Sequence, residues 1–301
     1  MDDKVKMSDL YHTDHLSDSR IIREILAGIR LFALDMDGTV YLGEKWIDGA
    51  VEFLNAVERS GRRYVFLTNN SSKNPESYVQ KLHKMGLDVG TDRIITSGDA
   101  TIDMLKRRYP DSKVYLLGND LLKKQFADAG IAPVNDELEE AYRTRGNIIR
   151  EINNNRVNMV VVGFDTSLDY LKLSVACDLV RSGLTYVTTH PDYNCPTETG
   201  FIPDAGAIHA FVEASAGRRP DIIVGKPESG IVDYMINKTG FNKEDIAMVG
   251  DRLYTDIATG VRAGLTSILV LSGETKEKDL EASDIKPDLV IPSVAELIQY
   301  L

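Results

Sequence analysis

The sequence of 301 residues predicts an α/β fold in which a second α/β unit is inserted into the first. Short apolar runs alternate with segments of helical periodicity along most of the chain, and this alternation starts afresh in the middle. Several of the apolar runs also end abruptly in polar residues. Because parallel strands are usually joined by helices, this pattern indicates a parallel sheet covered by helices on both faces.

The expected strands of the outer unit are apolar runs of three to six residues, as is typical of buried parallel strands. They cover residues 31–34, 64–67, 222–224, 246–249, 266–271 and 289–291. The expected helices cover residues 50–59, 75–85, 230–238 and 255–263, and each is followed closely by a glycine, which is the usual stop signal of a helix.

The inserted unit has its own expected strands at residues 114–117, 159–162 and 186–189. We therefore predict that residues 98–218 form an inserted domain and that residues 1–97 and 219–301 form the core domain around it. The first residues are polar and of mixed charge, and residues 1–25 are assigned to an N-terminal arm or short helix before the first strand.

Charge and cysteine usage exclude several classes of protein. The net charge of −11 and the pI near 5.0 argue against nucleic acid as a partner, because such binding relies on clustered Lys and Arg. Cys177 and Cys195 have no metal-ligand spacing and are too few for a disulfide framework, which favours a reducing, cytoplasmic location. With no apolar run of signal-peptide or membrane-span type, we expect no membrane partner.

Polar clusters follow four of the expected strands. In chain order they are Asp35-Met36-Asp37-Gly38-Thr39, Thr68-Asn69-Asn70, Gly225-Lys226-Pro227 and Gly250-Asp251 with Asp256. Ligands of parallel α/β sheets bind beyond the carboxyl ends of the strands, so the four clusters are expected to form one site. Taken singly, Asp35 also fits a surface turn, Asp256 a helix cap and Lys226 a solvated surface group.

Three of these acids indicate a metal ion. Asp35, Asp37 and Asp251, gathered without a counter-ion, would repel one another by several kcal/mol at modest dielectric. A divalent cation removes this repulsion, and a set of oxygen ligands is what Mg²⁺ prefers. The expected cofactor is therefore Mg²⁺.

The four clusters, in this order, resemble the motifs of the haloacid dehalogenase superfamily. Residues 67–72 and 250–257, together with the large insertion, are similar to the branch of NagD and 4-nitrophenylphosphatase over nearly the whole chain after about residue 25. The resemblance implies a Rossmann-like, doubly wound parallel sheet as the core, with the inserted α/β domain as a cap. It also implies an Mg²⁺-dependent phosphatase that hydrolyses small phosphate monoesters through an aspartyl-phosphate intermediate.

The same resemblance implies the roles of the acids. Asp35 would attack phosphorus, while Asp37 would protonate the leaving oxygen and then deprotonate the attacking water. Mg²⁺ would be held by the carboxylates of Asp35 and Asp251 and by the backbone carbonyl of Asp37. The presence of Asp37 favours phosphoryl transfer over dehalogenation, since the dehalogenases of this superfamily lack that acid.

The resemblance also implies how the phosphate is bound. The Thr68 hydroxyl, the Asn69 backbone and Lys226 would bind its oxygens. Asp256 would orient either a metal-bound water or Lys226 from behind the metal ligands.

The cap is expected to determine the substrate. His190 and Asp192 follow a cap strand and are candidates for substrate contacts, with ordinary turn capping as the alternative. A helical stripe is expected in the cap core or in a subunit contact, and it consists of Leu168, Leu171, Val175 and Leu179. Relatives of this branch often dimerise through the cap. Two other functions remain as alternatives: a phosphotransferase or mutase on the same core, and a non-catalytic regulator that binds phosphate and metal.

Overall fold

The computed structural model describes residues 19–197 and 200–301, and these fold into two compact units. The first unit contains the described residues up to Leu67 together with Thr239–Leu301, and the second contains Thr68–Lys238. The second unit is thus an insertion in the first. Of the predicted N-terminal arm, residues 1–18 lie outside the described residues, and the remainder begins helix α1 (Ser19–Ala27).

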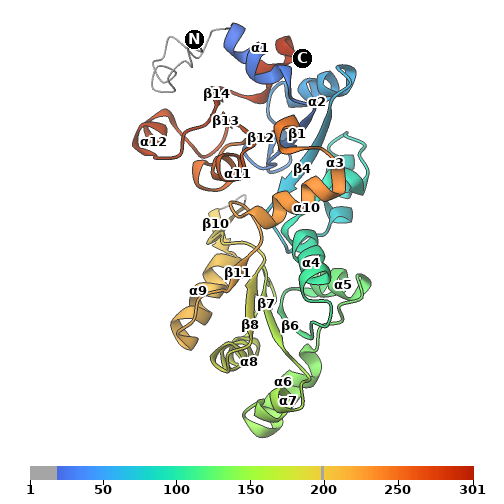
Figure 1. The fold of residues 1–301 in the computed structure, drawn as a ribbon, viewed down its shortest axis with the longest axis vertical. Coiled ribbons are helices and arrows are strands. Elements are labelled where there is room, and N and C mark those ends of the chain that lie inside the picture. Colours follow the sequence, from blue (N-terminus) through green and yellow to red (C-terminus); the bar gives the residue numbers. More distant parts are fainter. Residues whose placement is uncertain (1–18, 198–199) are drawn as a thin grey trace. The chain divides into compact units, whose positions relative to one another are not determined.

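The sheet of the first unit is parallel and buried. Its strand order is β14-β13-β12-β1-β4-β5, where β1 is Leu31–Leu34, β4 is Arg63–Thr68, β5 is Ile94–Thr96, β12 is Ile246–Gly250, β13 is Thr266–Val270 and β14 is Leu289–Ile291 (Figure 1). Every residue of β1 and β12 is buried, as expected of strands covered on both faces. The strands predicted in these places are confirmed.

Helices cover this sheet where the periodicity predicts them. Helix α2 (Ala50–Arg59) buries Phe53, whose ring meets Phe32 of β1 edge to face at 5.5 Å. The helix predicted at 255–263 begins as a π-helical turn, η4 (Leu253–Ile257), and continues as α11 (Ala258–Ala263). The remaining elements of this unit are the hairpin strands β2 (Tyr41–Leu42) and β3 (Lys45–Trp46), η3 (Lys243–Asp245), α12 (Glu277–Ala282) and η5 (Val294–Tyr300).

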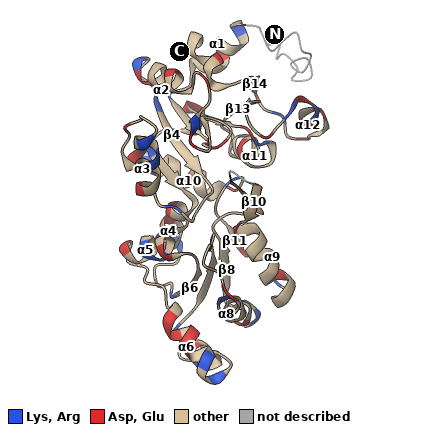
Figure 2. Ribbon diagram, turned by 180° about the vertical axis from the view of Figure 1, so that it is seen from behind, with Lys and Arg blue, Asp and Glu red and all other residues tan. Residues whose placement is uncertain are grey.

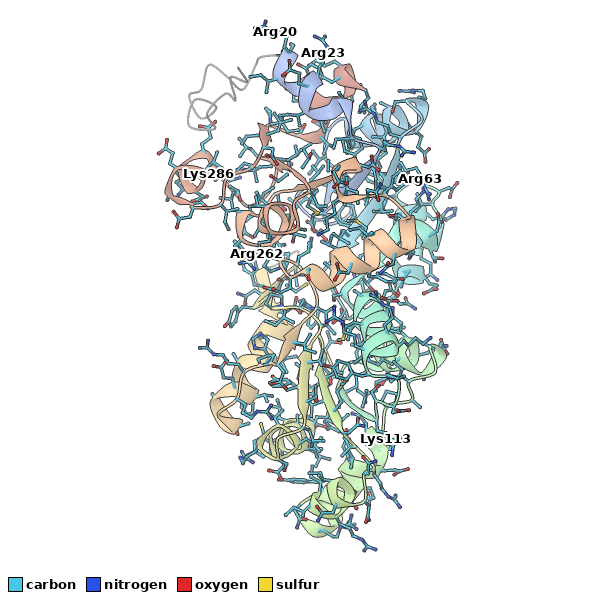
Figure 3. All side chains as sticks on the ribbon, viewed as in Figure 1. Arg20, Arg23, Arg63, Lys113, Arg262 and Lys286 are labelled. Carbon is cyan, nitrogen blue, oxygen red and sulfur yellow. The ribbon has the colours of Figure 1, made fainter. Side chains whose placement is uncertain are left out.

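Helix α1 packs near η5 at the end of the first unit. Figure 3 labels Arg20 and Arg23 on α1, and the Arg23 guanidinium lies 5.6 Å from the centroid of the Tyr300 ring. This cation–π contact joins the start of the described chain to its last helix.

The second unit has its own parallel sheet, with the strand order β11-β8-β7-β6 (Figure 1). Its strands are β6 (Val114–Leu117), β7 (Met159–Val162), β8 (Thr185–Thr188) and β11 (Ile222–Ile223). The prediction placed residues 222–224 in the core sheet, and this was wrong. β11 is only two residues long and pairs with β8, so its register is set by the inserted sheet.

The described part of the second unit also contains twelve further elements. They are α3 (Pro75–Lys84), η2 (Thr91–Arg93), β5 (Ile94–Thr96), α4 (Ser97–Arg108), α5 (Asp120–Asp128), α6 (Asn135–Arg145), α7 (Ile149–Asn153), α8 (Tyr170–Arg181), β9 (Asn194–Thr197), β10 (Gly200–Pro203), α9 (Ala205–Ala216) and α10 (Ser229–Thr239), whose last residue belongs to the first unit. The predicted stripe belongs to the core of this unit: Val175 and Leu179 of α8 are buried in its core cluster, and Leu168 and Leu171 pack against that cluster.

The predicted inserted domain, residues 98–218, lies wholly within the second unit. Its first boundary falls inside α4, which begins at Ser97, and its last precedes β11. The exact domain boundaries stay a prediction.

Charged residues of both signs share the same elements. Figure 2 shows Lys and Arg among Asp and Glu on α3, α6 and α12. Among the described residues, every helix is too short or too polar to cross a lipid bilayer.

Candidate active site

Asp35 lies directly after β1 in the first unit. Its backbone N–H donates to the carbonyl of Val249 at 2.8 Å, which continues the pairing of β1 with β12 and places the side chain at the carboxyl end of the strand. The chain then turns, and the Gly38 N–H donates to the Tyr41 carbonyl at 2.7 Å. The Asp37 carboxylate lies in this turn and accepts from the Gly43 N–H at 3.4 Å.

Asp251 follows the neighbouring strand β12 and is buried. Its Oδ2 accepts from the Glu274 N–H at 2.7 Å, whereas its Oδ1 has no hydrogen-bond partner among the described residues. The backbone around this carboxylate is close-packed, because a Cβ on Gly273 would lie 2.0 Å from Asp251 Oδ2. Asp251 is therefore held in place with one carboxylate oxygen left for a ligand.

Asp256 lies in the π-helical turn η4 and is also buried. Its Oδ2 accepts from the Arg252 N–H at 3.1 Å, at the residue that precedes the turn. The Asp256 side chain is thus bonded to the backbone at the start of the turn. It also joins the other acids.

The carboxylates of Asp35, Asp251 and Asp256 form a compact cluster, because one oxygen of each lies within 4.8 Å of the others. Burial, followed by the charges of Asp35 and Asp256, raises the pKa of Asp251 to about 7. A divalent cation fits this place on chemical grounds, since it offers buried oxygen ligands, an unpartnered carboxylate oxygen and repulsion that a positive charge would relieve.

Thr68, Asn69 and Lys226 belong to the second unit, where the side chains of all three are buried. The Asn69 side chain binds the backbone of Lys226 at both polar atoms: Oδ1 accepts from the Lys226 N–H at 2.7 Å, and Nδ2 donates to the Lys226 carbonyl at 2.8 Å. The Thr68 hydroxyl accepts from the Asn70 N–H at 3.2 Å. The structure therefore brings two of the three predicted phosphate-binding residues, Asn69 and Lys226, into direct contact.

Asp192 is joined to the same group, because its Oδ1 accepts a second hydrogen bond from Asn69 Nδ2 at 3.0 Å. His190 is different. Its ring is fully buried, with Nε2 2.8 Å from Asp204 Oδ1 and Nδ1 2.9 Å from the Thr189 hydroxyl. Burial disfavours the imidazolium, but the neighbouring Asp204 outweighs it and raises the pKa of His190. This environment favours a structural role for His190.

Two groups were not predicted from the sequence: the side chain of Asn69 and the acid Asp204. Only the Asn69 backbone was expected to act, whereas the structure shows its amide in three hydrogen bonds. The run of polar residues 68–72 directly after a buried strand was the available signal, since such residues need partners when they are buried. For Asp204 the signal was its place before a helix, where its carboxylate accepts from the Ala205 N–H at 2.6 Å.

Two family models match the chain. One, described as haloacid dehalogenase-like hydrolase, covers residues 32–132, and a second, described as HAD-hydrolase-like, covers residues 223–297. The first match includes the acids after β1, and the second includes Lys226, Asp251 and Asp256.

Curated relatives include two proteins named acid sugar phosphatase. The protein from Staphylococcus epidermidis is 36% identical over 256 residues, which are 85% of this chain and 92% of the relative. The protein from Staphylococcus aureus is 34% identical over 272 residues, covering 90% of this chain and 98% of the relative.

Solved structures are also similar to this chain over most of its length. A 4-nitrophenylphosphatase from Thermotoga maritima has a TM-score of 0.82 and 45% identity, with 91% of this chain and 98% of that chain covered. NagD from Escherichia coli has a TM-score of 0.77 and 32% identity, with 89% and 98% covered. These similarities extend over both units of the chain.

Proposed function

Since this chain belongs to the haloacid dehalogenase-like hydrolases, we propose that it is a phosphatase of small phosphate monoesters, with sugar phosphates among its substrates. The relatives that it matches over most of their length are named phosphatases. The observation that carries the proposal is the cluster of Asp35, Asp251 and Asp256. In this cluster the buried Oδ1 of Asp251 has no hydrogen-bond partner within the described part of the chain.

The proposed reaction has two steps. An Asp35 carboxylate oxygen attacks phosphorus and forms an aspartyl phosphate, while the ester P–O bond breaks and Asp37 gives its proton to the leaving oxygen. Asp37 then takes a proton from a water whose oxygen attacks the same phosphorus. The bond to Asp35 breaks, inorganic phosphate leaves, and both acids return to their starting states.

Mg²⁺ is the proposed cofactor, as is general for phosphatases of this superfamily. Asp35 and Asp251 would hold it with their carboxylates and Asp37 with its backbone carbonyl, while Asp256 adds a further carboxylate beside them. When bound, the ion supplies positive charge that offsets the repulsion between the attacking carboxylate and the phosphate.

Three residues of the second unit are proposed to bind the phosphoryl oxygens. They are Thr68 through its hydroxyl, Asn69 through its backbone N–H and Lys226 through its ammonium group. Hydrogen bonds and positive charge placed in advance at these oxygens stabilise the negative charge of the transition state. Asp192 is proposed to contact the remainder of the substrate, because it lies within hydrogen-bond distance of Asn69.

The test is release of inorganic phosphate from 4-nitrophenyl phosphate and a set of sugar phosphates, with Mg²⁺ and with a chelator. We expect hydrolysis that needs Mg²⁺ and is abolished in Asp35→Asn, whose amide does not act as the nucleophile. A tenth of wild-type activity retained in Asp35→Asn would disprove this assignment. Faster turnover with an added phosphate acceptor would instead indicate a phosphotransferase, and binding of Mg²⁺ and phosphate without hydrolysis would indicate a regulator.

We also propose that the protein is a homodimer that associates through the second unit. Tyr170 on α8 is 80% exposed and Phe211 on α9 is 45% exposed, and both line a cavity of about 250 Å³ with Tyr142 and Cys177. Exposed aromatic residues of this kind are enriched at protein interfaces. Sedimentation velocity should give a dimer for the wild type and a monomer for Tyr170→Asp, and a monomeric wild type at micromolar concentration would refute the proposal.

The cytoplasm is the proposed place of action. Cys177 is a free, buried thiol, which suits a reducing compartment. Fractionation of the source cells tests this, and recovery of the protein outside the cytoplasmic fraction would contradict it.

A further inference from the structure

We infer that the side-chain amide of Asn69 is a positioning group that fixes Lys226 for phosphate binding. This inference rests on the proposed function of Lys226. It goes beyond that function, because it assigns the positioning of Lys226 to the Asn69 side chain, which does not itself need to touch the substrate.

The amide of Asn69 forms a ring of hydrogen bonds with the backbone of one residue. Its Oδ1 accepts from the Lys226 N–H at 2.7 Å, and its Nδ2 donates to the carbonyl of the same lysine at 2.8 Å. These two hydrogen bonds to the Lys226 backbone fix the direction in which the Lys226 side chain leaves the main chain. The remaining hydrogen of Nδ2 goes to Asp192 at 3.0 Å, so both donor sites of the amide are used.

Asn69 itself is held on several sides. The Ser97 hydroxyl at the start of α4 hydrogen-bonds the Asn69 carbonyl. The backbone of residue 225 also lies against the amide, because a Cβ on Gly225 would be 2.6 Å from Asn69 Oδ1 and 2.7 Å from the Thr189 carbonyl. The close approach of Asn69 to Lys226 therefore needs glycine at 225.

The segment that carries Asn69 is anchored to the inserted sheet by other side chains. The Ser71 hydroxyl accepts from the Phe164 N–H at 2.9 Å and lies 3.1 Å from the Thr189 hydroxyl. Asn119 Nδ2 donates to the Ser72 carbonyl at 2.8 Å. These bonds come from the ends of β6, β7 and β8, and Asn69 adds the end of β11.

Lysine needs such a frame more than arginine does. Its ammonium is a compact charge on four flexible carbons, and it has no planar fork to set its own direction. Displacement of a binding group by about 1 Å can lower the rate by about a hundredfold. A fixed backbone at Lys226 limits the displacement of its ammonium group, because the point from which the side chain starts does not move.

The experiment is a double-mutant cycle of Asn69→Ala and Lys226→Ala, with kcat/KM for 4-nitrophenyl phosphate and the inhibition constant of inorganic phosphate as readouts. We expect Asn69→Ala to lose about tenfold in kcat/KM and to weaken phosphate inhibition by a similar factor. In the Lys226→Ala background, the same change should cost less than about twofold, because its target is already absent.

Ser71→Ala is the matched control, since Ser71 is a buried residue of the same segment whose hydroxyl bonds to Phe164 and lies beside the Thr189 hydroxyl. It should lower the melting temperature but change kcat/KM by less than about twofold. If Asn69→Ala does not fold, Asn69→Asp takes its place: it keeps the volume and the acceptor for the Lys226 N–H but loses both donated bonds. Asp192→Asn is then added to remove the repulsion between residues 69 and 192.

Two outcomes would overturn the inference while leaving the phosphatase assignment intact. One is an equal loss from Asn69→Ala with and without Lys226, and the other is an equal loss from Ser71→Ala and Asn69→Ala. A wild-type protein without phosphatase activity would overturn the proposed function, and this inference with it.

Discussion

Gly38 leaves room for the carboxylate of Asp251: a Cβ built on residue 38 would lie 2.4 Å from Asp251 Oδ2. Gly38 also has a φ of +87°, which side chains other than glycine rarely adopt. The turn after β1 and the acid after β12 thus lie in close contact, which only glycine at position 38 permits.

Gly38→Ala should reduce kcat/KM by about a hundredfold, because the methyl group displaces Asp251 from the carboxylate cluster. Gly61→Ala is the control, since Gly61 also has a positive φ, of +78°, but nothing lies within 4 Å of its Cβ. Both variants should lose about 1 kcal/mol of stability from backbone strain, measured by denaturant unfolding. An equal loss of activity in both would show that strain alone, and not Asp251, is responsible.

Asp37→Asn should lose most of its activity on alkyl phosphates and less on 4-nitrophenyl phosphate. The nitrophenolate leaves without a proton, whereas an alkoxide needs the proton that we assign to Asp37. The measurement is the ratio of kcat values for the two substrates in the variant and in the wild type. An unchanged ratio would remove the general-acid role from Asp37.

Without Mg²⁺, the protein should become less stable as the pH rises from about 5 to about 8. The pKa of Asp251 is raised to about 7 in the folded state, so the folded protein holds a proton there that the unfolded chain has already lost above its ordinary pKa of 3.8. The contribution of this proton to stability is fully present below the ordinary pKa of 3.8, and it is lost as the pH rises through about 7.

Thermal unfolding in chelator across this pH range checks the prediction, and Asp251→Asn should flatten the profile. Added Mg²⁺ should restore stability most at high pH, because it binds the ionised carboxylate. A wild-type profile as flat as that of Asp251→Asn would contradict the assignment.

Lys172→Met should destabilise the second unit by about 3 kcal/mol, because it leaves the buried carboxylate of Asp165 without its cation. Lys172 Nζ lies 3.0 Å from Asp165 Oδ2, and the Asp165 side chain is fully buried. Lys124→Met is the control: Lys124 pairs with Asp128 on the surface, so its loss should cost less than about 1 kcal/mol. Urea unfolding measures the free energy of unfolding of both variants. Similar losses in the two would show that the buried ion pair contributes no more than the surface pair.

Much of the fold follows from local pattern. β1, β12, β6 and β7 lie where the apolar runs predict them, because a strand buried on both faces has little choice but to be apolar throughout. The similarity to phosphatases was also foreseen, since the acids after β1 and β12 lie in short motifs that are read directly along the chain.

The sheet to which β11 belongs was not predictable in this way. Residues 222–224 have the same apolar character as the core strands, but pairing is a relation between two segments, and β11 pairs with β8. The burial of His190 against Asp204 was also not predictable from local sequence, because the two residues are 14 positions apart and only the fold brings them together.

The sequence by itself determined where the acids, the hydroxyl and the lysine stand along the chain, and with them the chemistry that such groups perform. Only the tertiary structure decided that Asp256 joins Asp35 and Asp251, and that the Asn69 amide holds Lys226, which is 157 residues away. The physical reason is that residue type and local periodicity act over a few residues, whereas a carboxylate cluster or a hydrogen bond depends on which distant segments the packed core brings together.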